Sequence, residues 1–167
     1  AGLRVIAAHN LAHDLLILPH QIDAAAEAAT SVPEGRFVID HLGKPNVGSG
    51  SLEGWACSIS ELAQRENVTA KVSGLVTEAD WVAWTVDDLR PYVDRALVSF
   101  GPHRLMFGSD WPVCTLAATY EQVVDSVTRL TSALSSGEQL AVFGGTATSV
   151  YSLTDRIAAS NSHQEPQ

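Results

Sequence analysis

Residues 105–112, Leu-Met-Phe-Gly-Ser-Asp-Trp-Pro, are the most informative part of the sequence for the fold. Its apolar first part has the length of a buried parallel strand and is too short for a helix. Pro112 lacks an amide hydrogen and cannot extend a central strand, so the strand ends at or before Trp111. Asp110 therefore follows the carboxyl end of a buried strand, where α/β proteins carry their chemistry. Taken alone, this Asp could also cap the next helix or close an Asx-turn.

Working outward, the chain repeats the same pattern of strand, loop and helix. His41, Ser73 and Asp110 each end an apolar strand, and each is followed by a loop and a helical pattern. The apolar periodicity and the Gly and Pro positions predict helices at 2–9, 21–31, 52–66, 86–100, 117–134 and 138–151, the last interrupted at Gly144 and Gly145, and strands at 15–18, 37–41, 68–75 and 104–109.

Alternating βα units imply an α/β fold with a parallel sheet. A closed barrel needs eight such units and roughly 250 residues, whereas this chain of 167 residues supplies four units. We therefore expect half a barrel or a small open α/β sheet, formed by one domain at residues 1–153. The polar residues 154–167 are expected to form a disordered tail.

The composition is that of an ordinary globular protein, with 46% hydrophobic and 17% charged residues. The net charge of −9 argues against nucleic acid or an anionic membrane as a partner. The sequence contains no apolar run of transmembrane length and no leader pattern, which predicts a cytoplasmic protein. Cys57 and Cys114 are far apart and are expected to be reduced thiols without a metal or redox role.

On a parallel sheet, His20, His41, Ser73 and Asp110 would all lie at the carboxyl ends of neighbouring strands and face one crevice. Asp110 could then take a proton from water while His41 polarises a carbonyl group or binds a metal. Each residue also has a structural interpretation. His41 could form a strand-end turn with its own hydrogen bonds, and His20, after Pro19, could be a solvent-facing loop residue.

Two further residue types could complete a site. Lys71 alternates with Ser73 on one side of its strand and could pair with Asp110, hold an anionic substrate, or be half of a structural ion pair. Trp111, with Trp81 and Trp84, could wall a pocket for a flat or sugar-like substrate, although aromatic residues near helix starts are usually core. Metal binding lacks a motif, since the sequence has no His-x-His, no His-Glu-x-x-His and no Cys cluster.

Three motifs in this order resemble the amidohydrolase-related family, a superfamily of TIM-barrel metal-dependent hydrolases, and within it the L-fuconolactonase-like sugar-lactonase branch. They are residues 37–45 (Phe-Val-Ile-Asp-His-Leu-Gly-Lys-Pro), residues 71–75 (Lys-Val-Ser-Gly-Leu) and residues 105–112. The resemblance extends over about residues 2–153. It includes the shorter stretches 77–81 and 143–147.

The resemblance implies a (β/α)₈ barrel of which this chain holds the last four βα units. It implies a hydrolase of sugar lactones or related esters and amides in carbohydrate metabolism, with Asp110 as the catalytic base and His41 polarising the carbonyl. Lys71, His20, Trp111 and Ser73 would contact the substrate. Many members of the lactonase branch do not require a metal. For this chain the alternatives are no cofactor or one divalent metal (Zn or Mn), for which His41 and Asp110 would be the ligands.

The family's first-strand motif, His-x-His or His-x-Trp, does not occur in this sequence. A half-barrel also leaves two open sheet edges and an uncovered interior. We therefore expect the barrel to be completed by a homodimer or by a missing amino-terminal half. The alternatives to a lactonase are a non-catalytic half-barrel that serves as an assembly module, and a metal-dependent decarboxylase or amidase of the same superfamily.

Overall fold

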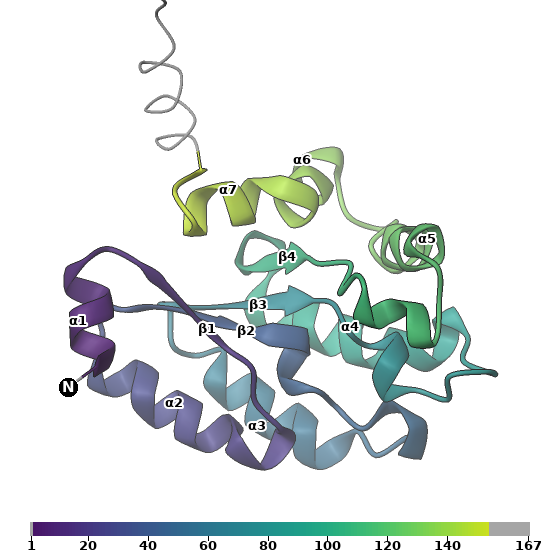
Figure 1. The fold of residues 1–167 in the computed structure, drawn as a ribbon, viewed down its shortest axis with the longest axis horizontal. Helices are drawn as coiled ribbons and strands as arrows, with labels where there is room; N and C mark the ends of the chain where they lie inside the picture. Colours follow the sequence, from purple (N-terminus) through teal and green to yellow (C-terminus); the bar gives the residue numbers. More distant parts are fainter. Residues whose placement is uncertain (1, 154–167) are drawn as a thin grey trace, which may run out of the picture.

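The computed structural model describes residues 2–153, which form a parallel four-stranded sheet with helices packed around it (Figure 1). The expected tail at 154–167 lies outside the described residues. The strands are β1 (Ala12–Leu15), β2 (Arg36–Ile39), β3 (Val68–Val72) and β4 (Leu105–Phe107). The helices are α1 (Gly2–Ala8), α2 (Ile22–Ser31), α3 (Glu53–Leu62), α4 (Val86–Phe100), α5 (Tyr120–Leu130), α6 (Ser136–Leu140) and α7 (Thr146–Val150).

The strands lie side by side in chain order, β1-β2-β3-β4, and every neighbouring pair is parallel. The predicted α/β class is therefore confirmed. Because parallel strands point the same way, the loops that follow β2, β3 and β4 emerge at one edge of the sheet. The register pairs Ile39 with Ala70 and Lys71 with Met106, which places the ends of these three strands close together.

The first strand lies earlier in the sequence than its apolar content predicts. The expectation was residues 15–18, but the ladder with β2 pairs Ala12 with Arg36 and ends at Leu15 with Ile39. Leu16 and Leu18 lie beyond the ladder and are 66% and 46% exposed. The prediction relied on the apolar character of these residues, whereas the bounds of a strand are set by its backbone pairing with the neighbouring strand.

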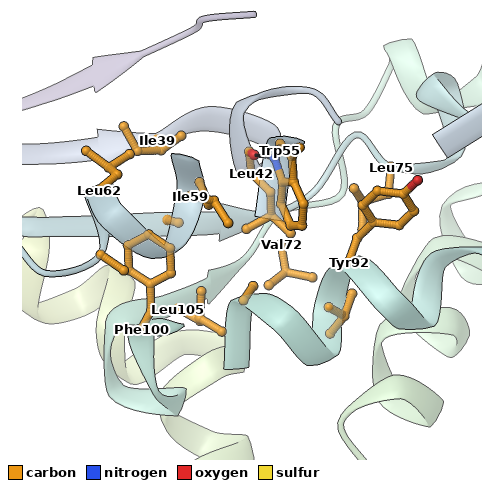
Figure 2. Close-up of a cluster of buried hydrophobic side chains, with 14 of the residues drawn as sticks. Ile39, Leu42, Trp55, Ile59, Leu62, Val72, Leu75, Tyr92, Phe100 and Leu105 are labelled. Atoms are coloured by element: carbon orange, nitrogen blue, oxygen red, sulfur yellow. Dashed lines mark hydrogen bonds between the residues drawn. The ribbon is translucent and has the colours of Figure 1, made fainter. Parts of the chain in front are cut away.

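The hydrophobic core joins the sheet to the inward faces of α2, α3, α4 and α5. In Figure 2, Trp55 of α3 lies beside Leu42 and near Tyr92 of α4. The rings of Trp55 and Tyr92 are 5.3 Å apart, and the Trp55 indole nitrogen donates a hydrogen bond of 2.8 Å to the Leu42 carbonyl. The core therefore reaches the loop that follows β2.

The later helices differ from prediction mainly at their ends. Helix α4 has the predicted bounds, whereas α5 begins after Thr119, whose hydroxyl accepts a hydrogen bond from the Gln122 amide. The last helical segment is interrupted as predicted, by a π-turn at Ala141–Gly145 between α6 and α7. No helix among residues 2–153 has the length and apolar character needed to cross a membrane.

Candidate functional site

The candidate site lies where β2, β3 and β4 end. Asp40 and His41 follow β2, Ser73 follows β3, and Asp110 comes three residues after β4. The His41 and Asp110 side chains are 18% and 13% exposed, so both reach solvent from a mostly buried position. The structure therefore brings His41, Ser73 and Asp110 to one edge of the sheet.

The His41 ring bridges β2 to β4. Its Nδ1 atom is 2.8 Å from the Ser73 hydroxyl, and its Nε2 atom is 3.7 Å from Asp110 Oδ1. Since strands β2 and β4 are two positions apart, about 10 Å at the usual spacing, the ring must cross the end of β3 to reach Asp110. The crossing orients one ring nitrogen to Ser73 and the other to Asp110.

Glycine makes this crossing possible. Gly74 has φ +64°, and a Cβ atom there would lie 2.6 Å from His41 Nδ1 and 2.7 Å from its Cγ. Gly108 has the same relation to Ser73, because a Cβ there would lie 3.0 Å from the Ser73 Cβ. Any other residue at position 74 would meet the imidazole, so the ring lies directly against the backbone of the loop that follows β3.

The chain reaches this geometry through an uncommon left-handed turn. His41, Leu42 and Lys44 have φ of 54°, 52° and 53°, and Gly43 between them has φ of 71°. The left-handed region costs roughly 1–2 kcal/mol for each non-glycine residue. Such conformations persist only where the surrounding structure holds them.

Three contacts hold the turn. The Leu42 side chain is fully buried, and its carbonyl accepts the Trp55 hydrogen bond. The Lys44 ammonium lies 2.6 Å from the Glu78 carboxylate, which ties the turn to the loop after β3. Core packing and one ion pair therefore compensate the backbone strain that positions His41.

Lys71 belongs to a separate charged cluster. Its Nζ atom lies 2.7 Å from Asp40 Oδ1 and 3.0 Å from Asp14 Oδ2, and the Tyr151 hydroxyl donates a hydrogen bond of 2.7 Å to Asp14 Oδ1. Among residues 2–153, Lys71 forms its ion pairs with these two carboxylates and none with Asp110. The geometry is that of the structural ion pair, and the pairing of Lys71 with Asp110 that the sequence allowed is not formed.

The charge states of this cluster follow from the same contacts. Burial lowers the pKa of Lys71, but the hydrogen bonds to Asp40, Asp14 and Tyr151 outweigh it and raise that pKa overall. Burial, together with the Asp14 hydrogen bond, raises the pKa of Tyr151 to about 12. Lys71 is thus a cation neutralised by two carboxylates, and an anionic substrate would have to compete with both.

Sequence reasoning missed Asp14 and Tyr151 as partners of Lys71. Asp14 lay outside the expected strand at 15–18, whereas it belongs to β1 in the structure. Tyr151 is far from Asp14 in the sequence, and no local pattern connects them. The available signal was the alternation of polar residues, which placed Lys71 and Ser73 on one side of the strand.

The remaining predicted site residues are solvent-facing. Trp111 directly follows Asp110 and is 66% exposed, whereas His20 is exposed in the short helical turn Pro19–Gln21 before α2. Of the two other tryptophans, Trp81 donates to the Thr77 carbonyl and Trp84 to the Ala117 carbonyl. Trp81 and Trp84 thus use their indole nitrogens to brace loops.

The donors present do not by themselves make a metal site. Zinc in proteins is held by three or four side chains, whereas His41 and Asp110 supply two donor atoms, 3.7 Å apart. Within the described part of the chain, no group of three or more His, Cys, Asp or Glu side chains could hold a metal ion.

Comparison with known proteins gives a consistent result. A family model described as amidohydrolase matches residues 1–153. The L-fucono-1,5-lactonase of Burkholderia multivorans is 40% identical over 164 residues, covering 92% of this chain and 55% of the relative. The L-fucono-1,5-lactonase of Burkholderia ambifaria is 45% identical over 115 residues, covering 68% of this chain and 39% of the relative.

A solved structure agrees with these relatives. A crystal structure of an amidohydrolase from Burkholderia multivorans with bound zinc has a TM-score of 0.87 and 39% sequence identity, and the match covers 90% of this chain and 56% of that one. The chain thus spans about half the length of the relatives it matches. With the family model extending over nearly the whole sequence, the chain belongs to the amidohydrolase family.

Proposed function

We propose that this chain forms the carboxyl-terminal half of a (β/α)₈ barrel hydrolase that opens a sugar lactone by attack of water. The observation that carries the proposal is the pair of His41 Nε2 and Asp110 Oδ1, 3.7 Å apart and partly exposed at the carboxyl edge of the sheet. Two similar proteins named L-fucono-1,5-lactonase support a lactone as the substrate class.

In the proposed reaction, Asp110 accepts a proton from water as the water oxygen bonds to the lactone carbonyl carbon. His41 donates a hydrogen bond from Nε2 to the carbonyl oxygen, where negative charge develops. The ring C–O bond then breaks, and the released oxygen takes the proton from Asp110. The product is the open-chain hydroxy acid.

Substrate contacts come from the residues around this pair. We expect the exposed Trp111 indole to lie against the ring of the substrate, because it adjoins Asp110. His20 is a second candidate contact. Lys71, neutralised by Asp40 and Asp14, is expected to act on the substrate only indirectly.

A closed barrel needs four more βα units than this chain supplies, so a partner would have to provide them. The sheet ends at β1 and β4, and exposed apolar side chains follow both strands, among them Leu16 and Leu116. We propose that a second copy of the chain, or an amino-terminal half with the missing βα units, covers these edges. Sedimentation at micromolar concentration tests this, since a compact monomer that unfolds cooperatively would contradict it.

The test of the reaction compares Asp110→Asn with a matched control, Asp125→Asn. Asp125 is an exposed carboxylate on α5 that pairs with Arg129. Loss of a general base is expected to lower turnover of L-fucono-1,5-lactone by about 100-fold or more, whereas Asp125→Asn should leave it unchanged. Retained turnover in Asp110→Asn would rule out the assignment. A native chain that folds without turning over lactone would favour the non-catalytic assembly module.

A metal-dependent amidase or decarboxylase is the second candidate, favoured by the zinc in the similar crystal structure. The discriminating measurement is turnover after dialysis against a chelator. The lactonase proposal expects unchanged hydrolysis of the lactone. Loss that zinc or manganese restores would favour the metal-dependent alternative.

A further inference from the structure

We infer that Ser73 is a positioning residue that fixes the tautomer of His41, so that the ring carries its proton on Nε2 and presents it toward Asp110. The inference rests on the proposed function for its catalytic meaning. Its geometry stands independently, because it uses only contacts within β2, β3, β4 and the loops that follow them.

Ser73 is a buried residue just after the end of β3. The residue is 4% exposed, and within residues 2–153 its hydroxyl forms one side-chain hydrogen bond, at 2.8 Å to His41 Nδ1. A buried hydroxyl proton without an acceptor costs free energy. If the Ser73 hydroxyl donates to Nδ1, its proton is satisfied, and Nδ1 must then be the bare nitrogen of the neutral ring.

The other ring nitrogen of His41, Nε2, lies near a carboxylate. Nε2 faces Asp110 Oδ1 at 3.7 Å. A bare Nε2 would direct its lone pair at a carboxylate, which is repulsive, whereas an Nε2–H group is attracted to it. Both ends of the ring therefore favour the same tautomer.

Close contacts with two glycines restrict rotation of the His41 ring. Gly74 lies so close to His41 that an added Cβ would be 2.6 Å from Nδ1, and Gly108 lies in the same way against Ser73. The imidazole lies against the backbone of Gly74, just after β3, and Ser73 lies against that of Gly108, just after β4. The hydrogen bond fixes which nitrogen faces Ser73, and the two glycines let the ring and the hydroxyl approach.

The assignment has a chemical consequence. A ring with its proton on Nε2 can donate a hydrogen bond to a substrate carbonyl oxygen. The opposite tautomer, with the proton on Nδ1, would present a lone pair from Nε2, as a metal ligand does. By holding the proton on Nε2, Ser73 favours hydrogen bonding of His41 to a carbonyl oxygen over binding of a metal through Nε2.

The experiment measures the tautomer directly on the 167-residue chain. Long-range ¹H–¹⁵N spectra distinguish a protonated ring nitrogen from a bare one, and His41→Gln assigns the His41 signals. The expected native result is a proton on Nε2 and a bare Nδ1. In Ser73→Ala the two tautomers should mix, and in Ser73→Thr, which keeps the hydroxyl, the native pattern should return. A native ring protonated on Nδ1, or a pattern unchanged in Ser73→Ala, would overturn the inference.

A second pair of variants guards against loss of folding in Ser73→Ala. Gly74 and Gly50 have nearly the same φ, +64° and +66°, but an added Cβ at Gly50 meets nothing within 4 Å. Gly74→Ala should therefore change the His41 signals, whereas Gly50→Ala should leave them as in the native chain. Equal His41 spectra in the two variants would contradict the proposed contact. The serine control is Ser60→Ala, which removes a hydroxyl that pairs with Ser99 elsewhere.

The turnover assay then separates this inference from the proposed function. Ser73→Ala should lower kcat by about 10- to 100-fold with little change in KM, and Ser73→Thr should recover it. If Asp110→Asn keeps its activity while Ser73→Ala still mixes the tautomers, the proposed function fails and the positioning role stands. If Asp110 proves essential while His41 ignores Ser73, the positioning role fails alone.

Discussion

Leu42 provides the sharpest test of how the His41 turn is held. Its side chain is fully buried, as is that of Leu62 at the end of α3, and both belong to the same core (Figure 2). Truncation to alanine removes three carbon atoms, worth about 2.4 kcal/mol at about 0.8 kcal/mol each. With the cavity term, we expect each variant to lose about 2–5 kcal/mol of unfolding free energy.

The two variants should differ at the site. His41, Leu42 and Lys44 hold left-handed conformations that cost roughly 3–6 kcal/mol together, at roughly 1–2 kcal/mol each. Burial of Leu42 supplies a stabilisation of similar size, so Leu42→Ala allows the turn to relax and His41 to leave Ser73. Leu62 lies outside the turn, and Leu62→Ala should keep the His41 contacts.

Urea unfolding gives the free energies, and the His41 side-chain signals report the position of the ring. The expected result is a similar loss of stability in both variants, with altered His41 signals in Leu42→Ala only. Native His41 signals in a destabilised Leu42→Ala would refute the reasoning, because the strained turn would then be held without its buried leucine. Altered signals in both variants would show that general loosening of the core, and not this turn, moves His41.

Two further predictions concern the Lys71 cluster. Lys71→Met should lower the free energy of unfolding by about 1–3 kcal/mol, between the values for exposed and buried ion pairs, because Asp40 and Asp14 lose their cation. Adding Asp40→Asn to Lys71→Met should restore part of this free energy, as measured by urea unfolding. Purely additive effects of the two substitutions would argue against coupling between Lys71 and Asp40. Lys71 and Tyr151 both have raised folded-state pKa values, the latter moved from 10.0 to about 12. They bind protons more tightly when folded, so their contribution is complete below about pH 10 and is lost as the pH rises toward 12. The alkaline fall in unfolding free energy should be smaller in Tyr151→Phe, and an equal fall would exclude Tyr151 as a cause.

The order of the elements, and the edge of the sheet that carries His41, Ser73 and Asp110, could both be predicted from the sequence. The apolar run before Pro112 placed Asp110 beyond a strand, and the repeated βα pattern predicted parallel strands, as observed. These features are local, because strand length, proline and the repeat of apolar residues act over a few positions. The amidohydrolase resemblance followed from the same stretches and agrees with the family match.

Which side chains meet depends on contacts between segments that are distant in the sequence. The pairing of Lys71 with Asp14 joins residues of β3 and β1, and the bridge from His41 to Asp110 crosses the end of β3. The left-handed turn at His41 could not be predicted, because three non-glycine residues, His41, Leu42 and Lys44, adopt an unfavoured conformation there. Packing of the buried Leu42 side chain against residues that are distant in the sequence stabilises this conformation. Local sequence sets local preference, whereas packing between distant segments supplies the free energy that overrides it.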